Sequence, residues 1–239
     1  MASAKKRKLT GALPKRDQIF EAVNASERFS GVFFVDERSV KRALSALQRG
    51  PIRFHRNNVI ACEGEAADYI FLVVSGIVRS CRTFQNGNRN IVAFYLTGDL
   101  FGWSDQKYSL SVEAATDAMV LFLKRSALIS VAARESRVAS FLLDVATSEL
   151  RRTQEQAVLM GRSAKSRVAT FLTDLSRRLR RPNAIDFPMS HQDIADHLGL
   201  TIETLSRTIT DLQRSGLVSR AGTRTLILRN DRLLSQVSE

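Results

Sequence analysis

Residues 190–207 read SHQDIADHLGLTIETLSR, and this run holds the whole of one short helix and the start of a second. Ser190 is a typical N-cap with Asp193 three residues later, so a first helix begins here. Gly199 supplies the turn, and Thr201 can cap a second helix. The apolar residues that would face a core recur at helical spacing: Ile194, Ala195, Leu198, Leu205, Ile209 and Leu212. Two short helices joined by a glycine-containing turn are the pattern of a helix-turn-helix.

The residues that follow predict a β-hairpin. Residues 216–218 (GLV) lead into residues 225–228 (TLIL) across Ala221-Gly222-Thr223, which is the pattern of two short strands and a turn. Upstream, Pro182-Asn183 and Pro188 bracket a turn or a short strand. Together with the two helices, the hairpin would complete a winged helix-turn-helix.

Three polar side chains share the side of the second helix that lies opposite its apolar residues. Glu203, Ser206 and Arg207 are spaced i, i+3 and i+4, so they project from one face near the helix N-terminus. In a helix-turn-helix, that end of the helix meets base edges in the major groove of DNA. A Glu and an Arg four residues apart are by themselves usually only a surface ion pair. Within the complete winged motif we favour base reading.

Between Pro51 and Leu123 the sequence changes to short apolar or alternating runs, separated by Gly and Asn. Asn86-Gly87 lies between two of these runs and is a strong hairpin signal. The pattern is typical of an antiparallel sandwich or barrel, so a small all-β domain is expected here. The expected strands are 52–61, 69–74, 77–84, 90–96, 110–115 and 118–123.

Helices are expected on both sides of this β-domain. Residues 40–47 have apolar residues at helical spacing and stop at Gly50-Pro51. Residues 124–160 contain no Pro or Gly and consist mostly of helix formers, and after a break at Gly161 residues 164–179 form a further amphipathic helix.

The long helix has two apolar stripes. The first stripe is Val138, Phe141, Leu142 and Val145. The second stripe is Leu143, Ala146, Leu150, Thr153, Ala157 and Met160. A helix with two apolar faces needs two partners, which we interpret as the β-domain and the same helix of a second subunit in a short coiled coil. The alternative is a helix buried inside a monomer.

Composition and charge are those of a globular protein that suits a polyanionic partner. The 239 residues are 44% hydrophobic and 25% charged, with a formal net charge of +12. The basic residues near the N-terminus have no acidic neighbours in residues 1–16: Lys5, Lys6, Arg7, Lys8, Lys15 and Arg16. Such a tail either attracts phosphates in a sequence-independent way or is a solvated arm that only aids solubility.

Neither a membrane span nor a secretory signal is visible in the sequence, so we expect a cytoplasmic protein. Cys62 and Cys81 are the only cysteines, and both are expected inside strands. A disulfide framework is therefore disfavoured, and a four-cysteine site cannot be built within one chain. We interpret both cysteines as small buried side chains rather than as a redox switch. The chain contains no nucleophile elbow, no P-loop and no His/Cys cluster with metal-ligand spacing, so no catalytic or metal-binding residue is expected and an enzyme is disfavoured.

The run 190–207 resembles the helix-turn-helix of CRP/FNR transcription regulators, and specifically that of the FNR and FixK branch, which carries Glu-x-x-Ser-Arg on its recognition helix. In the N-terminal half, Glu63-Gly64, residues 75–79 (SGIVR), Asn86-Gly87 and residues 98–102 (GDLFG) follow the order of the family's cyclic-nucleotide-binding-like jelly roll. The resemblance covers about residues 50–230.

The resemblance implies an α+β chain with an N-terminal β jelly roll, a long dimerisation helix and a C-terminal winged helix-turn-helix. The expected parts are a basic flexible tail (1–20), the jelly-roll domain with an N-terminal helix (21–133), the dimerisation helix (134–160) and the DNA-binding domain (161–239). It further implies a cytoplasmic homodimer that regulates genes, more often by activation, at two-fold symmetric sites. Its implied partners are double-stranded DNA and RNA polymerase, with no membrane.

The family also implies roles for single residues, at half-sites like TTGA arranged as TTGA-N6-TCAA. Arg207 would donate two hydrogen bonds to guanine O6 and N7, Glu203 would accept from cytosine or a neighbouring adenine, and Ser206 would sit against thymine. Ile202 stands where cyclic-AMP-binding relatives place another Arg. The residues assigned to DNA phosphates, which fix register only, are His191, Gln192, Thr201 and Arg224.

Departures from the family pattern bear on the ligand. Cyclic-AMP-binding members have Gly-Glu after the Phe-Gly pair and an Arg-Ser or Arg-Thr pair for the phosphate, whereas here Trp103 follows Gly102 and Tyr108-Ser109 stands at the pair. Without that Arg the cyclic phosphate lacks a bidentate partner. Oxygen-sensing members have an N-terminal cysteine cluster for iron–sulfur ligation, which this chain lacks. We therefore expect a regulator without a cofactor. The alternative is a regulator of the same fold gated by haem or a small molecule, although a lone histidine such as His55 is more often structural.

Overall fold

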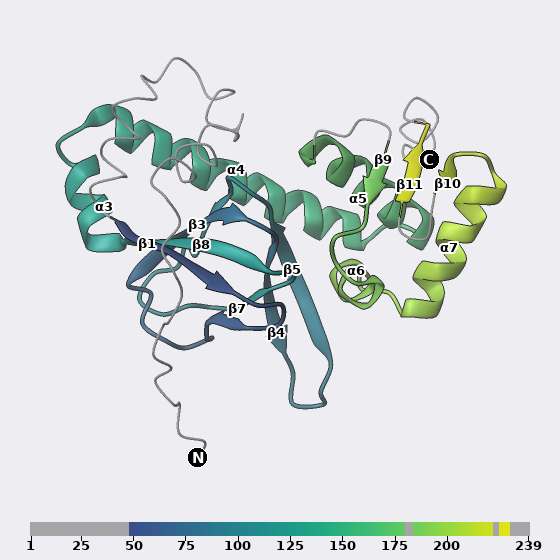
Figure 1. Ribbon diagram of the computed structural model, residues 1–239, viewed down its shortest axis with the longest axis horizontal. Coiled ribbons are helices and arrows are strands. Elements are labelled where there is room, and N and C mark those ends of the chain that lie inside the picture. Colours follow the sequence, from purple (N-terminus) through teal and green to yellow (C-terminus); the bar gives the residue numbers. More distant parts are fainter. Residues whose placement is uncertain (1–47, 180–183, 222–224, 230–239) are drawn as a thin grey trace.

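The computed structural model describes residues 48–179, 184–221 and 225–229. These residues form a β-domain, a long helix and a C-terminal domain of helices with a small sheet (Figure 1). The expected basic tail and the expected helix at 40–47 lie outside the described residues, as do Pro182-Asn183 and the wing residues 222–224, which include Arg224.

The β-domain consists of two four-stranded antiparallel sheets, with the strand orders β1-β8-β3-β6 and β2-β7-β4-β5. Strands far apart in sequence are neighbours, since β1 pairs with β8 and β2 pairs with β7, and this closes the expected jelly roll. Aromatic rings pack between the sheets, where Tyr95 of β5 stacks on Phe101 of β6 with 4.5 Å between ring centroids. The strands are β1 Gln48–Phe54, β2 Val59–Ala61, β3 Tyr69–Ser75, β4 Val78–Thr83, β5 Arg89–Tyr95, β6 Leu100–Phe101, β7 Ser111–Ala114 and β8 Ala118–Lys124.

The prediction of one strand over residues 52–61 is wrong. β1 and β2 are separated by a turn in which Asn57 has a φ of 65°. Asn is one of the few residues other than Gly that adopts this left-handed conformation at low cost. The turn is held by a hydrogen bond of 3.0 Å from the Arg56 backbone N–H to the Asp117 carboxylate. The sequence pattern also missed β6, which has only two residues and shows no alternation.

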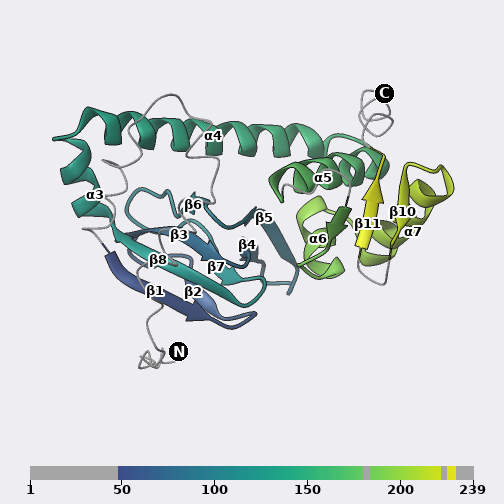
Figure 2. The same ribbon diagram turned by 45° about the horizontal axis from the view of Figure 1, so that its top comes forward.

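Two helices follow the jelly roll, α3 (Arg125–Ala132) and α4 (Ser136–Met160). The chain turns between them where Glu135 is extended, a break that no Pro or Gly announces. The first apolar stripe of α4 packs on the jelly roll as predicted, because Val138 and Phe141 are buried and Leu142 and Val145 are partly buried in the same cluster. Figure 2 shows α4 running across the jelly roll and on to the C-terminal domain.

The C-terminal domain is the predicted winged helix-turn-helix. Its elements are α5 Ala164–Arg178, β9 Ala184–Asp186, α6 His191–Leu198, α7 Ile202–Arg214, β10 Val218–Arg220 and β11 Thr225–Leu228. The wing strands β10 and β11 pair with each other, and β9 adds to the free edge of β11. Leu205, Ile209 and Leu212 on the inner face of α7 are all buried, as their spacing predicted.

The C-terminal domain shares a hydrophobic cluster with the jelly roll. Ile91 and Phe94 of β5 belong to the same buried cluster as Phe171 of α5 and Ile194 of α6. The helix-turn-helix is therefore docked on the jelly roll beside β5, in addition to its connection through α4. Within the described parts of the chain, no helix is long and apolar enough to cross a membrane.

Candidate nucleic-acid interface

The turn of the helix-turn-helix is built by the residues that the sequence suggested. The Ser190 hydroxyl accepts a hydrogen bond of 3.1 Å from the Asp193 backbone N–H, which caps α6. The Thr201 hydroxyl caps α7 by accepting from the Thr204 backbone N–H at 3.2 Å. Between the helices, Gly199 has a φ of 61°, a left-handed conformation that favours Gly. These three local devices fix the angle at which α7 leaves α6.

The outer face of α7 brings the three predicted base-reading residues together. Glu203, Ser206 and Arg207 are exposed and line one shallow groove on this face. The groove continues along the helix, where it is lined by Thr210, Asp211 and Arg214. Sequence reasoning missed these last three because it considered only the N-terminal end of the helix. The same i+3, i+4 spacing, extended by one more turn, would have found them.

The position of Glu203 in the first turn of α7 favours the ionised form of its carboxyl group. A hydrogen bond from its own backbone N–H lowers the pKa of the Glu203 carboxyl, and the Thr201 hydroxyl and the charge of Arg207 lower it further. Unpaired N–H groups at a helix N-terminus favour an anion. The groove therefore presents a carboxylate acceptor one turn before a guanidinium donor.

The predicted phosphate-contacting residues lie at the N-terminal ends of the two helices. His191 and Gln192 are exposed in the first turn of α6, and Thr201 is exposed at the start of α7. The Gln192 amide donates to the Asp196 carboxylate at 2.7 Å. The Thr201 hydroxyl is already used as the cap of α7, and it also lies 3.1 Å from the Thr204 hydroxyl.

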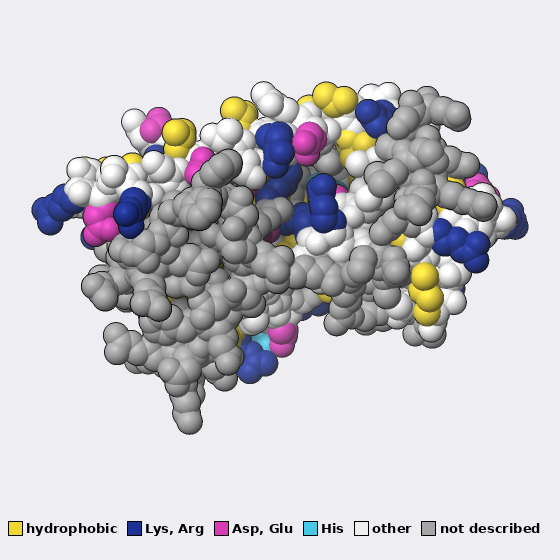
Figure 3. All heavy atoms as spheres, turned by 90° about the horizontal axis from the view of Figure 1, so that it is seen from above, with side chains coloured by type: hydrophobic (Ala, Val, Ile, Leu, Met, Phe, Trp, Pro, Cys, Tyr) yellow, Lys and Arg dark blue, Asp and Glu magenta, His cyan; other side chains and the backbone are white. Residues whose placement is uncertain are grey.

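The second apolar stripe of α4 is uncovered in this chain. Leu143 and Leu150 are 67% and 59% exposed, and Ala146, Thr153 and Ala157 are also exposed. Met160 differs, because it is partly buried against the hydrophobic cluster of the C-terminal domain. Sequence reasoning missed Val158, which is 65% exposed beside Ala157. Hydrophobic side chains are visible along one edge of the molecule when it is seen from above (Figure 3).

A cavity of about 380 Å³ lies between the jelly roll, α4 and α5. Trp103 and Tyr108, which depart from the cyclic-AMP-binding pattern, both line it. The Tyr108 hydroxyl donates to the Tyr69 carbonyl at 2.8 Å and accepts from the Tyr69 backbone N–H at 3.2 Å. The hydroxyl of Tyr108, which the sequence resemblance places where the family's phosphate-binding Arg is expected, is thus bonded to the backbone.

The two cysteines differ in environment. Cys81 is buried in β4, as predicted, and burial raises the pKa of its thiol to about 11. The prediction that Cys62 is buried in a strand is wrong, because β2 ends at Ala61 and Cys62 is exposed in the turn that follows. Its backbone N–H donates to the Glu65 carboxylate at 3.0 Å, which holds that turn.

Both halves of the chain match known domain families. Residues 51–135 match the cyclic nucleotide-binding domain, and residues 166–236 match the Crp-like helix-turn-helix domain. The chain is 40% identical over 212 residues to the nitrogen fixation regulation protein FixK of Azorhizobium caulinodans, which covers 86% of this chain and 85% of that protein. It is 35% identical over 173 residues to the transcriptional activatory protein AadR of Rhodopseudomonas palustris, covering 70% and 72% of the two chains.

The solved structure of FixK2 from Bradyrhizobium japonicum is similar in fold and in sequence. It has a TM-score of 0.74 and 38% identity to this chain, of which it covers 79%, while 96% of that structure is matched. The similarity to FixK extends through the jelly roll, the long helix and the helix-turn-helix. The chain belongs to the CRP/FNR family of transcription regulators, in its FixK-like branch.

Proposed function

We propose that this protein is a homodimeric transcription activator that reads an inverted DNA repeat with the outer face of α7. The observation that carries the proposal is the groove on α7, where Glu203, Ser206 and Arg207 are exposed together near the helix N-terminus. In a winged helix-turn-helix this surface enters the major groove. Activation is supported by the relatives, one of which is called a transcriptional activatory protein. An activator of this kind has RNA polymerase as its second partner.

The uncovered stripe of α4 supports the dimer. Leu143 and Leu150 are seven residues apart and largely exposed, which is the spacing of a coiled-coil seam. Pairing of two α4 helices about a two-fold axis buries this stripe and relates the two α7 helices by the same axis. Symmetric recognition helices fit a DNA site whose two halves are inverted copies of each other.

For the DNA sequence we propose TTGA-N6-TCAA, whose half-site centres are about 10 base pairs apart, one turn of B-DNA. Arg207 donates to guanine O6 and N7, Glu203 accepts from cytosine or adenine, and Ser206 sits against thymine. The exposed residues at the N-termini of α6 and α7, namely His191, Gln192 and Thr201, contact phosphates together with Arg224 of the wing. The protein binds this site without cyclic AMP or an iron–sulfur cluster.

Footprinting tests the proposal directly. The purified full chain, with no added ligand, is bound to DNA that carries the inverted repeat, a single half-site or a scrambled site. We expect symmetric protection of both half-sites and much weaker binding to the single half-site. Sedimentation of the free protein should give the mass of two chains. Equal affinity for the inverted repeat and the scrambled site would contradict the proposed reading face, and a monomer bound to one half-site would contradict the proposed dimer.

A second candidate function is a ligand-gated form of the same regulator, and the cavity of about 380 Å³ favours it. Glu149 and Arg152 of α4 line this cavity, so a bound molecule would contact the helix that we assign to the dimer. A ligand changes DNA binding only if it binds two states of the protein with different affinities. Operator affinity measured before and after extensive dialysis, and again with haem added, distinguishes the two candidates. A loss on dialysis or a gain with haem favours the gated regulator.

A further inference from the structure

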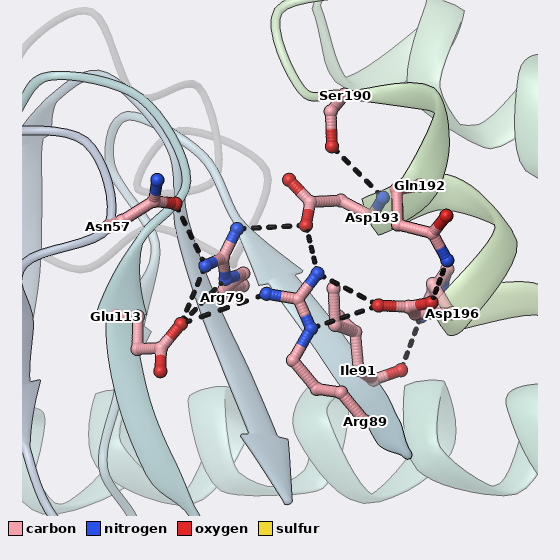
Figure 4. Close-up of polar contacts among 10 residues, drawn as sticks. Asn57, Arg79, Arg89, Ile91, Glu113, Ser190, Gln192, Asp193 and Asp196 are labelled. Carbon is pink, nitrogen blue, oxygen red and sulfur yellow. Dashed lines mark hydrogen bonds and ion pairs between the residues drawn. The ribbon is translucent and has the colours of Figure 1, made fainter. Parts of the chain in front are cut away.

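The helix-turn-helix is joined to the jelly roll by a network of buried and partly buried ion pairs, shown in Figure 4. The Asp193 Oδ1 atom of α6 accepts hydrogen bonds from Arg79 Nη1 of β4 at 2.9 Å and from Arg89 Nη2 of β5 at 2.5 Å. Arg89 also donates from Nε to the Asp196 carboxylate of α6 at 2.9 Å. Two arginines of one domain thus bind two aspartates of the other. We refer to Arg79, Arg89, Asp193 and Asp196 as the domain clamp.

The Arg79–Asp193 pair of the clamp is buried, Arg89 and Asp196 are partly exposed, and Arg79 is held in place by the jelly roll. Arg79 is 3% exposed and Asp193 is 2% exposed. Arg79 also binds Glu113 of β7 at 2.6 Å and Asn57 at 3.1 Å, so its guanidinium is fixed within the jelly roll before α6 reaches it. Charges out of contact with water need well-aligned partners, and guanidinium groups bind carboxylates in narrow geometries. The clamp therefore accepts α6 in one position.

Besides the clamp, one further arginine joins the two domains, and most of the remaining contact between them is apolar. Arg178 of α5 donates to the Asp99 carboxylate and to the Phe94 carbonyl oxygen of the jelly roll, both at 2.8 Å. Phe94 of β5 also packs edge-on against His197 of α6, with 5.1 Å between ring centroids. Apolar contact is non-directional and tolerates small shifts more readily than ion pairs do. The His197 Nδ1 atom lies 3.0 Å from the Ile91 carbonyl oxygen and adds one hydrogen bond beside the clamp.

The covalent connection between the domains lies at a different place from the clamp. α4 ends at Met160 and α5 begins at Ala164, and the Arg167 guanidinium binds the carbonyl oxygens of Met160 and Leu198 there. A rigid body that is attached at one corner can pivot about it, and a second attachment stops the pivot. The clamp and the Arg178–Asp99 ion pair are the directional parts of that second attachment.

We infer that the domain clamp sets the spacing between DNA half-sites that the dimer accepts. This inference rests on the proposed function, in which α4 forms the dimer seam and α7 reads a half-site. The clamp fixes the position of α7 relative to α4 and, through the two-fold axis, relative to the partner's α7. Each added base pair moves the half-sites about 3.4 Å apart and rotates them by about 34°. With the clamp formed, α7 cannot move to follow a changed distance and rotation between the half-sites. Without the clamp, α7 can move to reach them.

The test compares spacing preference with base preference. Competition binding uses inverted repeats with spacers one or two base pairs shorter and longer than the preferred one, and a second set with a changed guanine in the half-site. The variants are Arg89→Lys, Arg89→Ala, and Arg89→Ala combined with Asp193→Asn. In Arg89→Ala, Asp193 keeps Arg79 and Asp196 keeps Gln192, so no charge is stranded. Circular dichroism and thermal melting establish that each variant is folded.

The matched control is Arg82→Ala. Arg82 lies on β4 like Arg79, but it pairs within the jelly roll, with Glu63 at 2.9 Å and the Ser109 carbonyl at 2.7 Å. We expect it to leave the spacing preference unchanged.

In Arg89→Ala, the ratio of affinities for the preferred and shifted spacers should fall about fivefold or more, and further in the double variant. Arg89→Lys should lie between Arg89→Ala and the unaltered protein, and guanine preference should stay constant throughout.

The failure of this inference is distinguishable from the failure of the proposed function. If the unaltered protein prefers one spacer and the folded clamp variants keep the same ratio, the inference is wrong and the proposed function stands. If the variants lose spacing and base preference together, the clamp has only a structural role and the inference is equally wrong. If the unaltered protein binds single half-sites as well as inverted repeats, both fail.

Discussion

Arg207 projects from the exposed side of α7, one helical turn after Glu203 and one before Asp211. The two neighbours make the groove chemically mixed, with carboxylates on both sides of the guanidinium. A planar fork with parallel donors matches O6 and N7 of guanine and no other base. A change at Arg207 should therefore affect recognition of the DNA sequence more than general affinity for DNA.

Replacing Arg207 by Ala is expected to cost about 1 to 3 kcal/mol per half-site and to relax the preference for guanine, because the two hydrogen bonds to the base are lost. Competition binding on a half-site library measures both effects. Arg214→Ala is the control, since Arg214 is exposed on the same groove two turns later and should leave base preference intact. An equal loss for every base at the guanine position would make Arg207 a backbone contact.

His197 is the residue whose titration bears on stability. Burial lowers the pKa of its imidazole from the ordinary 6.5 to about 4, against the opposing hydrogen bond to the Ile91 carbonyl, while Arg178 lowers it and Asp174 raises it. Between these two values the unfolded chain binds a proton that the folded chain excludes. The free energy of unfolding should therefore fall as the pH drops from 6.5 towards 4, and His197 should have no such effect above pH 7.

Urea denaturation at pH 7 and pH 5 measures this effect. The loss of unfolding free energy between the two pH values should be smaller in His197→Gln by at most about 2 kcal/mol, at about 1.4 kcal/mol for each pH unit below 6.5. His191→Gln is the control, because His191 is exposed at the surface of α6 and should leave the pH dependence unchanged. Identical pH dependence in the unaltered protein and His197→Gln would show that His197 is not buried as described.

At the scale of elements, α4 has two faces with different environments. Val138 and Phe141 are buried against the jelly roll, while Leu143 and Leu150 face away from it. These two leucines lie about half a helical circumference from the buried pair, at 100° per residue. A stripe of this kind is rarely left exposed on a monomer. The expected partner is the α4 helix of a second chain.

Leu150→Arg should convert the dimer into a monomer, because the coiled-coil seam would have to bury an unpaired charge. Sedimentation should give the mass of one chain, and affinity for the inverted repeat should fall to that for a single half-site. Glu155→Arg adds the same group to α4 outside the stripe, where the residue is exposed, and should stay dimeric. A Leu150→Arg variant that remains a dimer with tight DNA binding would place the interface elsewhere.

At the scale of the whole molecule, the cavity beside Tyr108 bears on whether cyclic AMP acts on the protein. The sequence resemblance places Tyr108 where the family's phosphate-binding Arg is expected, and the Tyr108 hydroxyl is bonded to the Tyr69 backbone. A cyclic phosphate beside Tyr108 would lose its water without gaining a bidentate partner, since the arginines that line the cavity come from α4 and α5. We expect no heat of binding in calorimetry with micromolar cyclic AMP and no change in operator affinity. Micromolar binding with a parallel rise in operator affinity would overturn this expectation.

The winged helix-turn-helix was predictable from the sequence because its signals are local. Ser190, Gly199 and Thr201 lie within a few residues of the groups that they cap or join, and the buried residues of α7 follow one helical period. The jelly roll was predictable as a pattern of strands, but not the turn at Asn57, because a polar break inside an apolar run resembles an alternation. Element type follows from local pattern more readily than element boundaries do.

The domain clamp was beyond sequence reasoning for the opposite reason. Asp193 fits a capping role at the start of α6, and that local role explains its presence completely. Its ion-pair partner Arg79 is 114 residues earlier in the chain, and no spacing rule connects two residues on different domains at that separation. Contacts of this kind are set by how finished domains fit together, which the periodicity of single elements does not encode.

One hydrophobic cluster continues from β5 into α5 and α6, so the jelly roll and the winged domain share part of their core. Cutting the chain near Gly161 would separate the DNA-reading part from the jelly roll on paper, but it would bare the apolar sides of Ile91 and Phe94 on one fragment and of Ile194 on the other. Each fragment would then expose a hydrophobic patch and would tend to aggregate. A chimera that borrows the winged domain of a relative would inherit the same problem, unless the borrowed α6 brings side chains that complement this particular β5 surface.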